Sequence, residues 1–227
     1  MTLISIRVIF HPERGYMYSP YELKNLREKP RINDLSLETL RQYYEYYLNP
    51  FIYHYNITYT DGSQKNLELR FDQENFCHLL GIESIAKKSI AFSNLKNYKG
   101  LHGWNNIKNG SLDISTLKKL NKRQFMNVKA KYVYFYLIPN LITSPLAVNY
   151  QKSNVSPPTL IESEILFYSP VENDTAIIHL GIQQKSGSSY RIPRTFFVEK
   201  VSSDAADIYV KNQEKILVSV QKRIILQ

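Results

Sequence analysis

The sequence predicts an α+β fold with an N-terminal helix and β-hairpin, a basic helical middle and a C-terminal antiparallel sheet of about four strands. Apolar residues recur at helical spacing in two parts of the first two thirds of the chain. Strand-like alternation dominates the last third, where the links between the alternating segments are short. Short links favour antiparallel pairing, and helices followed by a run of strands favour segregated layers.

The N-terminal helix is expected over residues 35–47, where leucines and tyrosines recur at a spacing that places them on one face. Asp34 or Ser36 can cap its first turn, because their side-chain oxygens can accept hydrogen bonds from backbone amides that the helix leaves free. Pro50 closes the segment, since proline cannot continue a helix.

A β-hairpin is expected immediately afterwards and is the clearest local signal in the chain. Residues 51–59 and 65–71 alternate and are rich in side chains that favour strands. Asp61 and Gly62 lie between the two segments and tolerate positive φ angles, which favours a type I′-like turn. Next, residues 73–82 suit a short apolar helix stopped at Gly81.

The middle of the chain predicts a polar, Lys-rich loop followed by a long basic helix. His102 and Trp104 lie in the loop region. Asp113 or Ser115 can cap a helix that runs to about residue 142 and keeps apolar side chains at helical spacing. Pro139 is expected to kink or end this helix.

The C-terminal third predicts strands separated by turn-forming residues, and residues 207–226 fit either a strand or a helix. The strand segments are residues 146–150, 164–168, 176–182 and 194–199. We therefore divide the chain into residues 1–50, an N-terminal extension with a helix, and residues 51–227, an α+β domain. The two parts can also form one compact unit.

Positive charge is concentrated in one block. Residues 87–131 contain eleven Lys and Arg and one acid, Asp113, which gives the block a net charge of +10 while the rest of the chain sums to −1. Such a block is typical of proteins that bind a phosphate backbone, although a solvated Lys-rich helix face is the alternative. The candidate nucleic-acid contacts are His102, Trp104, Lys108, Lys118, Lys119, Lys122, Arg123 and, outside the block, Arg191.

The cysteine count and the length of the apolar runs indicate a cytoplasmic protein with no membrane partner. Cys77 is the single cysteine, so an intramolecular disulfide framework and a Cys-rich zinc site are excluded, and we expect it to be a small buried apolar residue. The longest apolar runs fall short of the roughly 20 residues that a membrane-spanning helix requires.

Several kinds of chemistry lack their sequence signatures. No Gly-rich phosphate loop, His-Glu-x-x-His helix or Gly-x-Ser-x-Gly elbow is present. The five histidines are far apart and the acids are scattered, so we expect neither a metal site nor a cofactor. RNA cleavage through its own 2′-hydroxyl remains compatible, because it needs only a proton acceptor, a proton donor and cations around the phosphate.

Three regions carry the candidate catalytic residues. His78 lies in the short apolar helix and can act as acid or base, or be an ordinary core histidine. His179 lies within an apolar strand. Arg191, Arg194 and Thr195 open a strand after a Gly/Ser loop; Arg suits bidentate phosphate contacts, although two solvated arginines are the alternative.

These segments, taken in order, resemble a known nuclease group. A hairpin strand over residues 67–71, a Phe-x-His-Leu-Leu-Gly helix over residues 76–81, a basic helical region and a C-terminal sheet are similar to the phage-type Barnase–EndoU–colicin–RelE-like nuclease domains of phages, mobile elements and toxin systems. The resemblance spans roughly residues 51–200. Glu83 and Ser84 depart from it, because many relatives have His-Lys at that point.

The resemblance implies helices on a four-stranded antiparallel sheet and an active site built from His, a basic residue and Ser or Thr. It assigns His78 as acid or base, Arg194 as phosphate stabiliser and Thr195 as a positioning group. The resulting hypothesis is a metal-independent endoribonuclease-like effector of a phage, mobile-element or toxin/defence system, with RNA or another polyanion as ligand and an antitoxin or a phage or host protein as a further partner. The rival is an inactive protein that seizes a phage or host protein; a DNA-binding regulator is disfavoured because no helix-turn-helix is evident.

Overall fold

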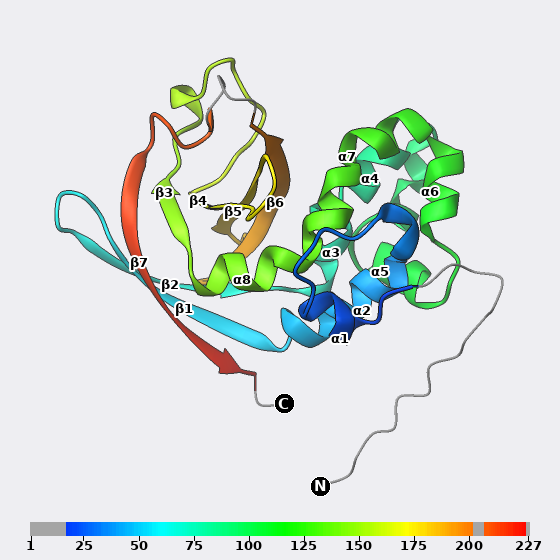
Figure 1. Cartoon of the computed structure of the whole chain (residues 1–227), viewed down its shortest axis with the longest axis horizontal. Helices are drawn as coiled ribbons and strands as arrows, with labels where there is room; N and C mark the ends of the chain where they lie inside the picture. The colour runs from blue at the N-terminus through cyan, green and yellow to red at the C-terminus, as the bar shows by residue number, and fades with distance from the viewer. Residues whose placement is uncertain (1–16, 202–206, 226–227) are drawn as a thin grey trace, which may run out of the picture.

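In a computed structural model of the chain, most helices gather on one side and the strands on the other, and helix α8 lies between the two groups (Figure 1). The structure describes residues 17–201 and 207–225. Residues 1–16 of the predicted N-terminal extension lie outside these ranges. The described strands number seven. They are β1 (Phe51–Thr58), β2 (Gln64–Arg70), β3 (Leu146–Asn149), β4 (Ile165–Pro170), β5 (Ala176–Gln184), β6 (Arg191–Lys200) and β7 (Glu214–Ile224).

The strands form a closed mixed barrel, in the order β1-β2-β6-β5-β4-β3-β7, so the prediction of a C-terminal antiparallel sheet of about four strands is wrong. The four predicted C-terminal strands do exist and pair antiparallel as β3–β4, β4–β5 and β5–β6. Closure comes from β7, which pairs with both β3 and β1, and from a short parallel contact of β2 with β6 at Leu69 and Arg191. The hairpin therefore belongs to the same sheet as the C-terminal strands.

The predicted hairpin is present, but its turn differs from the predicted type. The backbone amide of Gly62 donates to the carbonyl of Tyr59 at 3.0 Å, and Gly62 has φ +84°. Asp61 has no positive φ, whereas a type I′ turn needs positive φ at both central residues. Asp61 instead accepts a hydrogen bond from the backbone amide of Ser63 at 2.8 Å, which fixes a longer loop ending in a left-handed glycine.

The helices are α1 (Pro20–Lys24), α2 (Leu37–Tyr47), α3 (Phe76–Leu79), α4 (Ile82–Ala86), α5 (Gly100–Lys108), α6 (Ile114–Leu120), α7 (Lys122–Tyr134) and α8 (Ile138–Thr143). Helix α2 confirms the predicted N-terminal helix, with Ser36 as its cap. The predicted long basic helix is wrong as a single element. Asn121 ends α6 and caps α7 by accepting a hydrogen bond from the amide of Gln124, and a 3-10 turn separates α7 from α8.

The segment predicted as a polar loop contains a 3-10 helix (Phe92–Tyr98) and helix α5. Its Trp104 is only 2% exposed and packs edge-on against Tyr44 and Phe76. The segment folds because α5 lays its apolar face on α2 and α3.

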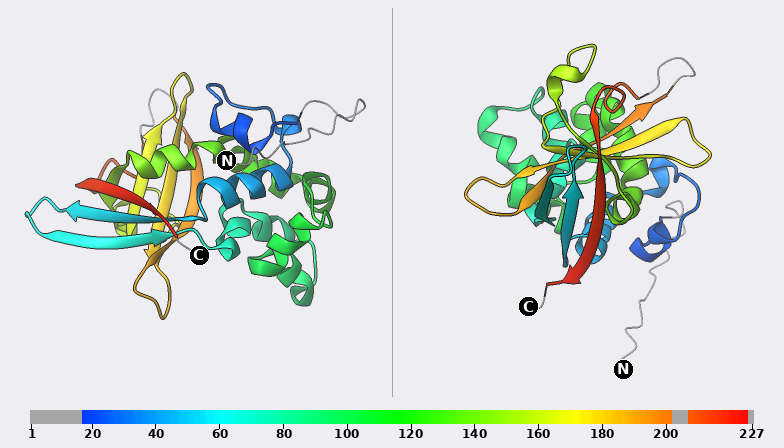
Figure 2. Two further views of the ribbon diagram at one scale, coloured as in Figure 1. Left: turned by 90° about the horizontal axis from the view of Figure 1, so that it is seen from below. Right: turned by 90° about the vertical axis from the view of Figure 1, so that its left-hand side faces the viewer.

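One hydrophobic core connects the helices to the barrel. Tyr44 of α2 stacks on Phe135, and Phe135 in turn contacts Phe76 of α3 and Phe196 of β6 through ring edges. All four rings are almost completely buried. Helices α3 and α7 both pack against β6, so residues from these three elements lie close together although more than forty residues separate each from the next. In the left-hand view of Figure 2, the hairpin extends from the barrel away from the helices.

Candidate active site at the junction of α3, α7 and β6

His78 is held at the surface by a short helix whose other residues are anchored in the core. Phe76, Cys77 and Leu79 are fully buried, whereas His78 is exposed. Gly81 then reverses the chain with φ +70°, a left-handed conformation that glycine adopts without strain. His78 is therefore accessible on a rigid support, and the alternative of a core histidine is wrong.

Arg194 is positioned by a β-bulge in β6. Gly181 pairs with Thr195 and Ile182 pairs with Pro193, which leaves Arg194 as the extra residue without a cross-strand partner. A bulge of this kind bends the strand and redirects a side chain. Arg194 is exposed, and its backbone hydrogen-bonds to His78.

Lys131 of α7 completes the group. Its Nζ lies 3.7 Å from the position that a Cβ would occupy if Gly81 had a side chain. Because glycine has none, the Lys131 amine can lie close to the backbone of Gly81. Desolvation by the surrounding protein lowers the pKa of Lys131 to about 8. Within the described residues, Lys131 forms no ion pair.

Burial and neighbouring positive charges both lower the pKa of His78. Desolvation lowers the pKa, and the positive charges of Arg194 and Lys131 lower it further. The backbone of Arg194 and the carboxylate of Glu83 act in the opposite direction. His78 is thus neutral at pH 7 and stands beside two cations, a combination suited to accepting a proton next to a bound phosphate.

Several cations elsewhere in the described part of the chain are paired with carboxylates. Arg41 is bound by Glu38 and Glu45, and Lys185 lies 2.7 Å from Asp72. No ion pair reaches Arg194 or Lys131 within the same residues, and the nearby Glu83 lies 3.6 Å from Lys99. Two cations without a carboxylate partner beside a histidine are an arrangement suited to an anion.

The structure separates the other predicted catalytic residues, Thr195 and His179, and the predicted nucleic-acid contact Arg191 from this group. Thr195 follows Arg194, but its methyl lies 2.8 Å from the point where a Cβ on Gly181 would stand, on the side of Ser163. Arg191 is 9% exposed and bound to Glu164, with Nε and Nη2 each 3.2 Å from a carboxylate oxygen, so it is a structural ion pair. His179 is completely buried and stacks on Phe197 at 4.4 Å.

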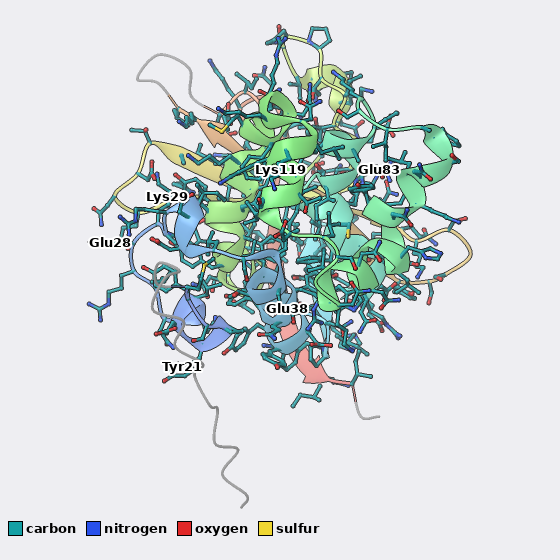
Figure 3. All side chains as sticks on the ribbon, turned by 90° about the vertical axis from the view of Figure 1, so that its right-hand side faces the viewer. Tyr21, Glu28, Lys29, Glu38, Glu83 and Lys119 are labelled. Atoms are coloured by element: carbon teal, nitrogen blue, oxygen red, sulfur yellow. The ribbon has the colours of Figure 1, made fainter. Side chains whose placement is uncertain are left out.

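The predicted nucleic-acid contacts divide by burial. Trp104 is in the core, where Arg41 lies 4.8 Å from its ring centre, so burial removes it from the surface available to a base. Lys118 is half-buried over Phe125. The exposed members are His102, Lys108, Lys119, Lys122 and Arg123. They lie on α5, α6 and α7, at the helical end of the molecule, where Figure 3 labels Lys119 and Glu83.

A polar cavity of about 540 Å³ opens on the outer face of β1, β2 and β7, and Arg191 of β6 contributes to its lining. His54 Nδ1 lies 3.9 Å from a carboxylate oxygen of Glu68, across the β1–β2 pair, and Arg223 lines the same cavity. His78, Arg194 and Lys131 do not line it. Arg191 and Arg194 share a strand, however, and three strand residues span roughly 10 Å.

Sequence reasoning counted Lys131 in the basic block without singling it out. Its helical position distinguishes it, because Val128 of α7 and Phe135, which caps the end of α7, lie three residues before it and four after it, and Phe135 is fully buried. In the sequence, a lysine among the apolar positions of a helix is therefore the feature that could have singled out Lys131. Its neighbour Gly81 is known only from the structure. His54 carried no signal in the sequence, since its partner Glu68 is defined only by the hairpin register.

No helix among the described residues has the length and apolarity needed to cross a membrane.

Comparison with known proteins identifies the family. No curated protein and no solved structure matches the chain significantly. The family model described as phage-Barnase-EndoU-ColicinE5/D-RelE like nuclease4 matches residues 37–227, which include all seven barrel strands and His78, Lys131 and Arg194. The chain therefore belongs to this family of nuclease-like proteins, as the resemblance over residues 51–200 predicted.

Proposed function

We propose that the protein is an endoribonuclease that cleaves RNA through the 2′-hydroxyl, without a catalytic metal ion, at the group formed by His78, Lys131 and Arg194. The proposal rests on one observation: neutral His78 of α3 lies beside Lys131 of α7 and Arg194 of β6, and neither cation has a carboxylate partner among the described residues. Membership of a nuclease family supports it independently.

Each residue has a distinct role in the proposed reaction. Neutral His78 accepts the proton of the 2′-hydroxyl as that oxygen attacks phosphorus. Protonated Lys131 donates a proton to the departing 5′-oxygen, and its pKa of about 8 suits a donor at neutral pH. Arg194 stabilises the charge that builds on the phosphate oxygens. The products are a 2′,3′-cyclic phosphate and a 5′-hydroxyl.

In this proposal, two further surfaces bind the parts of the RNA that flank the cleaved phosphate. The exposed lysines and arginine of α5, α6 and α7 attract the phosphate backbone without reading its sequence. The 540 Å³ cavity is lined by amides, hydroxyls and His54, groups that can hydrogen-bond to the edges of an unstacked base. A substrate of this kind is single-stranded, and a toxin or defence effector that acts on cellular or phage RNA has such substrates.

The experiment is incubation of the purified protein with a 5′-labelled single-stranded RNA, with and without EDTA, alongside His78→Gln. Wild type is expected to produce defined fragments that end in a 2′,3′-cyclic phosphate. His78→Gln is expected to reduce the rate by at least about 100-fold. Because His78 is exposed and its core neighbours are unchanged, its circular dichroism spectrum should match wild type.

Arg31→Gln is a matched control, because that side chain is 85% exposed, pairs with Asp34 and lies outside the site. Its cleavage rate should equal that of wild type. Intact RNA with wild-type protein, or equal cleavage by His78→Gln, would contradict the proposal and favour the rival protein that binds a partner without catalysis.

A further inference from the structure

A second cluster of ionisable side chains lies on the opposite face of the β5–β6 pair from the main core. His179 Nε2 lies 3.4 Å from Asp207 Oδ1 and 3.8 Å from Glu199 Oε2. One ligand atom from each of the three residues lies within 4.8 Å of both others. Twenty residues separate His179 from Glu199 in sequence, but β5 and β6 pair side by side and bring them together.

The cluster is enclosed by the protein. The His179 side chain is completely buried between Phe197, at 4.4 Å, and Tyr209, at 5.6 Å. The side chains of Glu199 and Asp207 are 11% and 17% exposed. Burial of two carboxylates beside each other is unfavourable unless a proton or a cation lies between them.

Polar atoms at the cluster lack protein partners. Glu199 Oε2 is buried and accepts no hydrogen bond in the described structure, although it faces His179 Nε2. The contact of His179 with Asp207 is long for a hydrogen bond, and Nδ1 of the same ring is also buried without a partner. His179 Nε2 and the carboxylate oxygens of Glu199 and Asp207 thus lie near one another inside the protein.

The distances suit a metal ion of defined size. Zinc binds His nitrogen and carboxylate oxygen at about 2.0–2.2 Å, so neighbouring ligands of a tetrahedral site lie roughly 3.3–3.6 Å apart. The separations of 3.4 and 3.8 Å approach this range without a change of strand register. One imidazole with two carboxylates is a ligand set for zinc or manganese, and enclosure with a low ligand number favours zinc.

We propose that His179, Glu199 and Asp207 bind one zinc ion that joins the segment beginning at Asp207 to strands β5 and β6. The role is structural, because the cluster lies on the face of Phe197, whereas His78 lies with α3. It is independent of the nuclease proposal, and its test uses no activity measurement.

The test is titration of the EDTA-treated and dialysed full chain with zinc chloride by calorimetry, together with thermal unfolding with and without zinc. Wild type is expected to bind one equivalent and to gain a higher Tm, because a ligand that binds only the folded state stabilises it. Glu199→Gln and Asp207→Asn keep the side-chain shape. Each is expected to weaken zinc binding by at least about tenfold and to remove the zinc-dependent Tm rise.

His102→Gln is the control, because it removes an exposed histidine from α5 and should leave zinc binding unchanged. Magnesium chloride in place of zinc chloride should give weaker binding, since an imidazole ligand disfavours magnesium. The proposal is overturned if wild type takes up no zinc, or if Glu199→Gln and Asp207→Asn bind it as tightly as wild type. In that event the carboxyl groups of Glu199 and Asp207 share a proton, and the Glu199→Gln protein should be as stable as wild type or more stable.

Discussion

At the scale of single residues, the same side-chain type has different uses in different surroundings. His78 stands on a buried helix with its ring accessible, His179 is sealed between aromatic rings, and His54 lines an open cavity opposite Glu68. The arginines of β6 differ in the same way. Arg191 is neutralised by Glu164, whereas Arg194 occupies a bulge and has no carboxylate partner among the described residues. Only Arg194 is therefore available to a phosphate.

Arg194→Gln tests this distinction. We expect kcat/KM for RNA cleavage to fall by about 100- to 1,000-fold, because a charge-stabilising donor at the phosphate is lost. The β6 backbone, which supports His78, should be unaffected since the side chain is exposed. Arg194→Lys should retain part of the activity, because it keeps the charge and loses the bidentate geometry. Full activity of Arg194→Gln would exclude Arg194 from the reaction.

At the scale of secondary-structure elements, one close approach holds the histidine helix in place. Helix α5 lies against α3 at Gly103, where an added Cβ would stand 2.7 Å from Cys77 Sγ and 2.9 Å from the backbone carbon of Tyr98. Cys77 immediately precedes His78 and is fully buried. The packing of α5 on α3 thus fixes the position from which His78 reaches the surface.

Gly103→Ala is expected to lower the free energy of unfolding by about 1–3 kcal/mol, because overpacking of this contact exceeds the gain in helix propensity. Denaturant unfolding measures the difference. Asn105→Ala is the matched control on the same helix: its side chain is exposed, and the change should leave stability equal or slightly higher. A Gly103→Ala protein as stable as wild type would mean that α5 and α3 can separate freely at this point.

Elements defined by local patterns could be predicted, whereas those defined by long-range pairing could not. The hairpin, α2 and β3–β6 each follow from alternation or helical spacing within about ten residues. The break at Asn121 was missed because α6 and α7 continue the same apolar spacing across it. Barrel closure depends on β7 pairing with β1, about 160 residues away, and no local signal encodes that partner.

The candidate site shows the same limit. His78 and Arg194 could be named from their residue types and local context, but their proximity depends on α3 and β6 packing together. Lys131 could not be chosen from eleven basic residues without knowing which of them faces Gly81. Trp104 was misassigned because an aromatic residue in a glycine- and lysine-rich segment resembles a stacking residue, and only tertiary packing shows that it is buried.

At the scale of the whole molecule, the charge is unevenly distributed. The basic block of residues 87–131 lies mainly on α5, α6 and α7 and contains one acid, Asp113, whereas the acids of the ion pairs, such as Glu38, Asp72 and Glu164, lie outside it. A positively charged end adjoining His78 concentrates a polyanion near the site and makes its binding dependent on salt.

The triple change of Lys119, Lys122 and Arg123 to Gln tests the role of this end. We expect the slope of log K against log salt concentration for single-stranded RNA to become shallower by up to about 2, since each lost phosphate contact contributes about 0.7. The paired change of Lys152 and Lys211 to Gln removes two exposed lysines outside the block and should leave the slope unchanged. An unaltered slope in the triple variant would place the RNA elsewhere.

The pH dependence of kcat/KM for RNA cleavage reports the paired action of His78 and Lys131 most directly. Activity should rise with pH as His78 loses its proton, with a pKa below 6.5, and fall above about 8 as Lys131 loses its own. Lys131→Arg should lower kcat/KM and remove the upper limb, because arginine keeps the charge but does not release its proton to the departing oxygen, while Lys152→Arg should keep the wild-type profile. An upper limb that persists in Lys131→Arg, or a lower limb that persists in His78→Gln, would contradict the account.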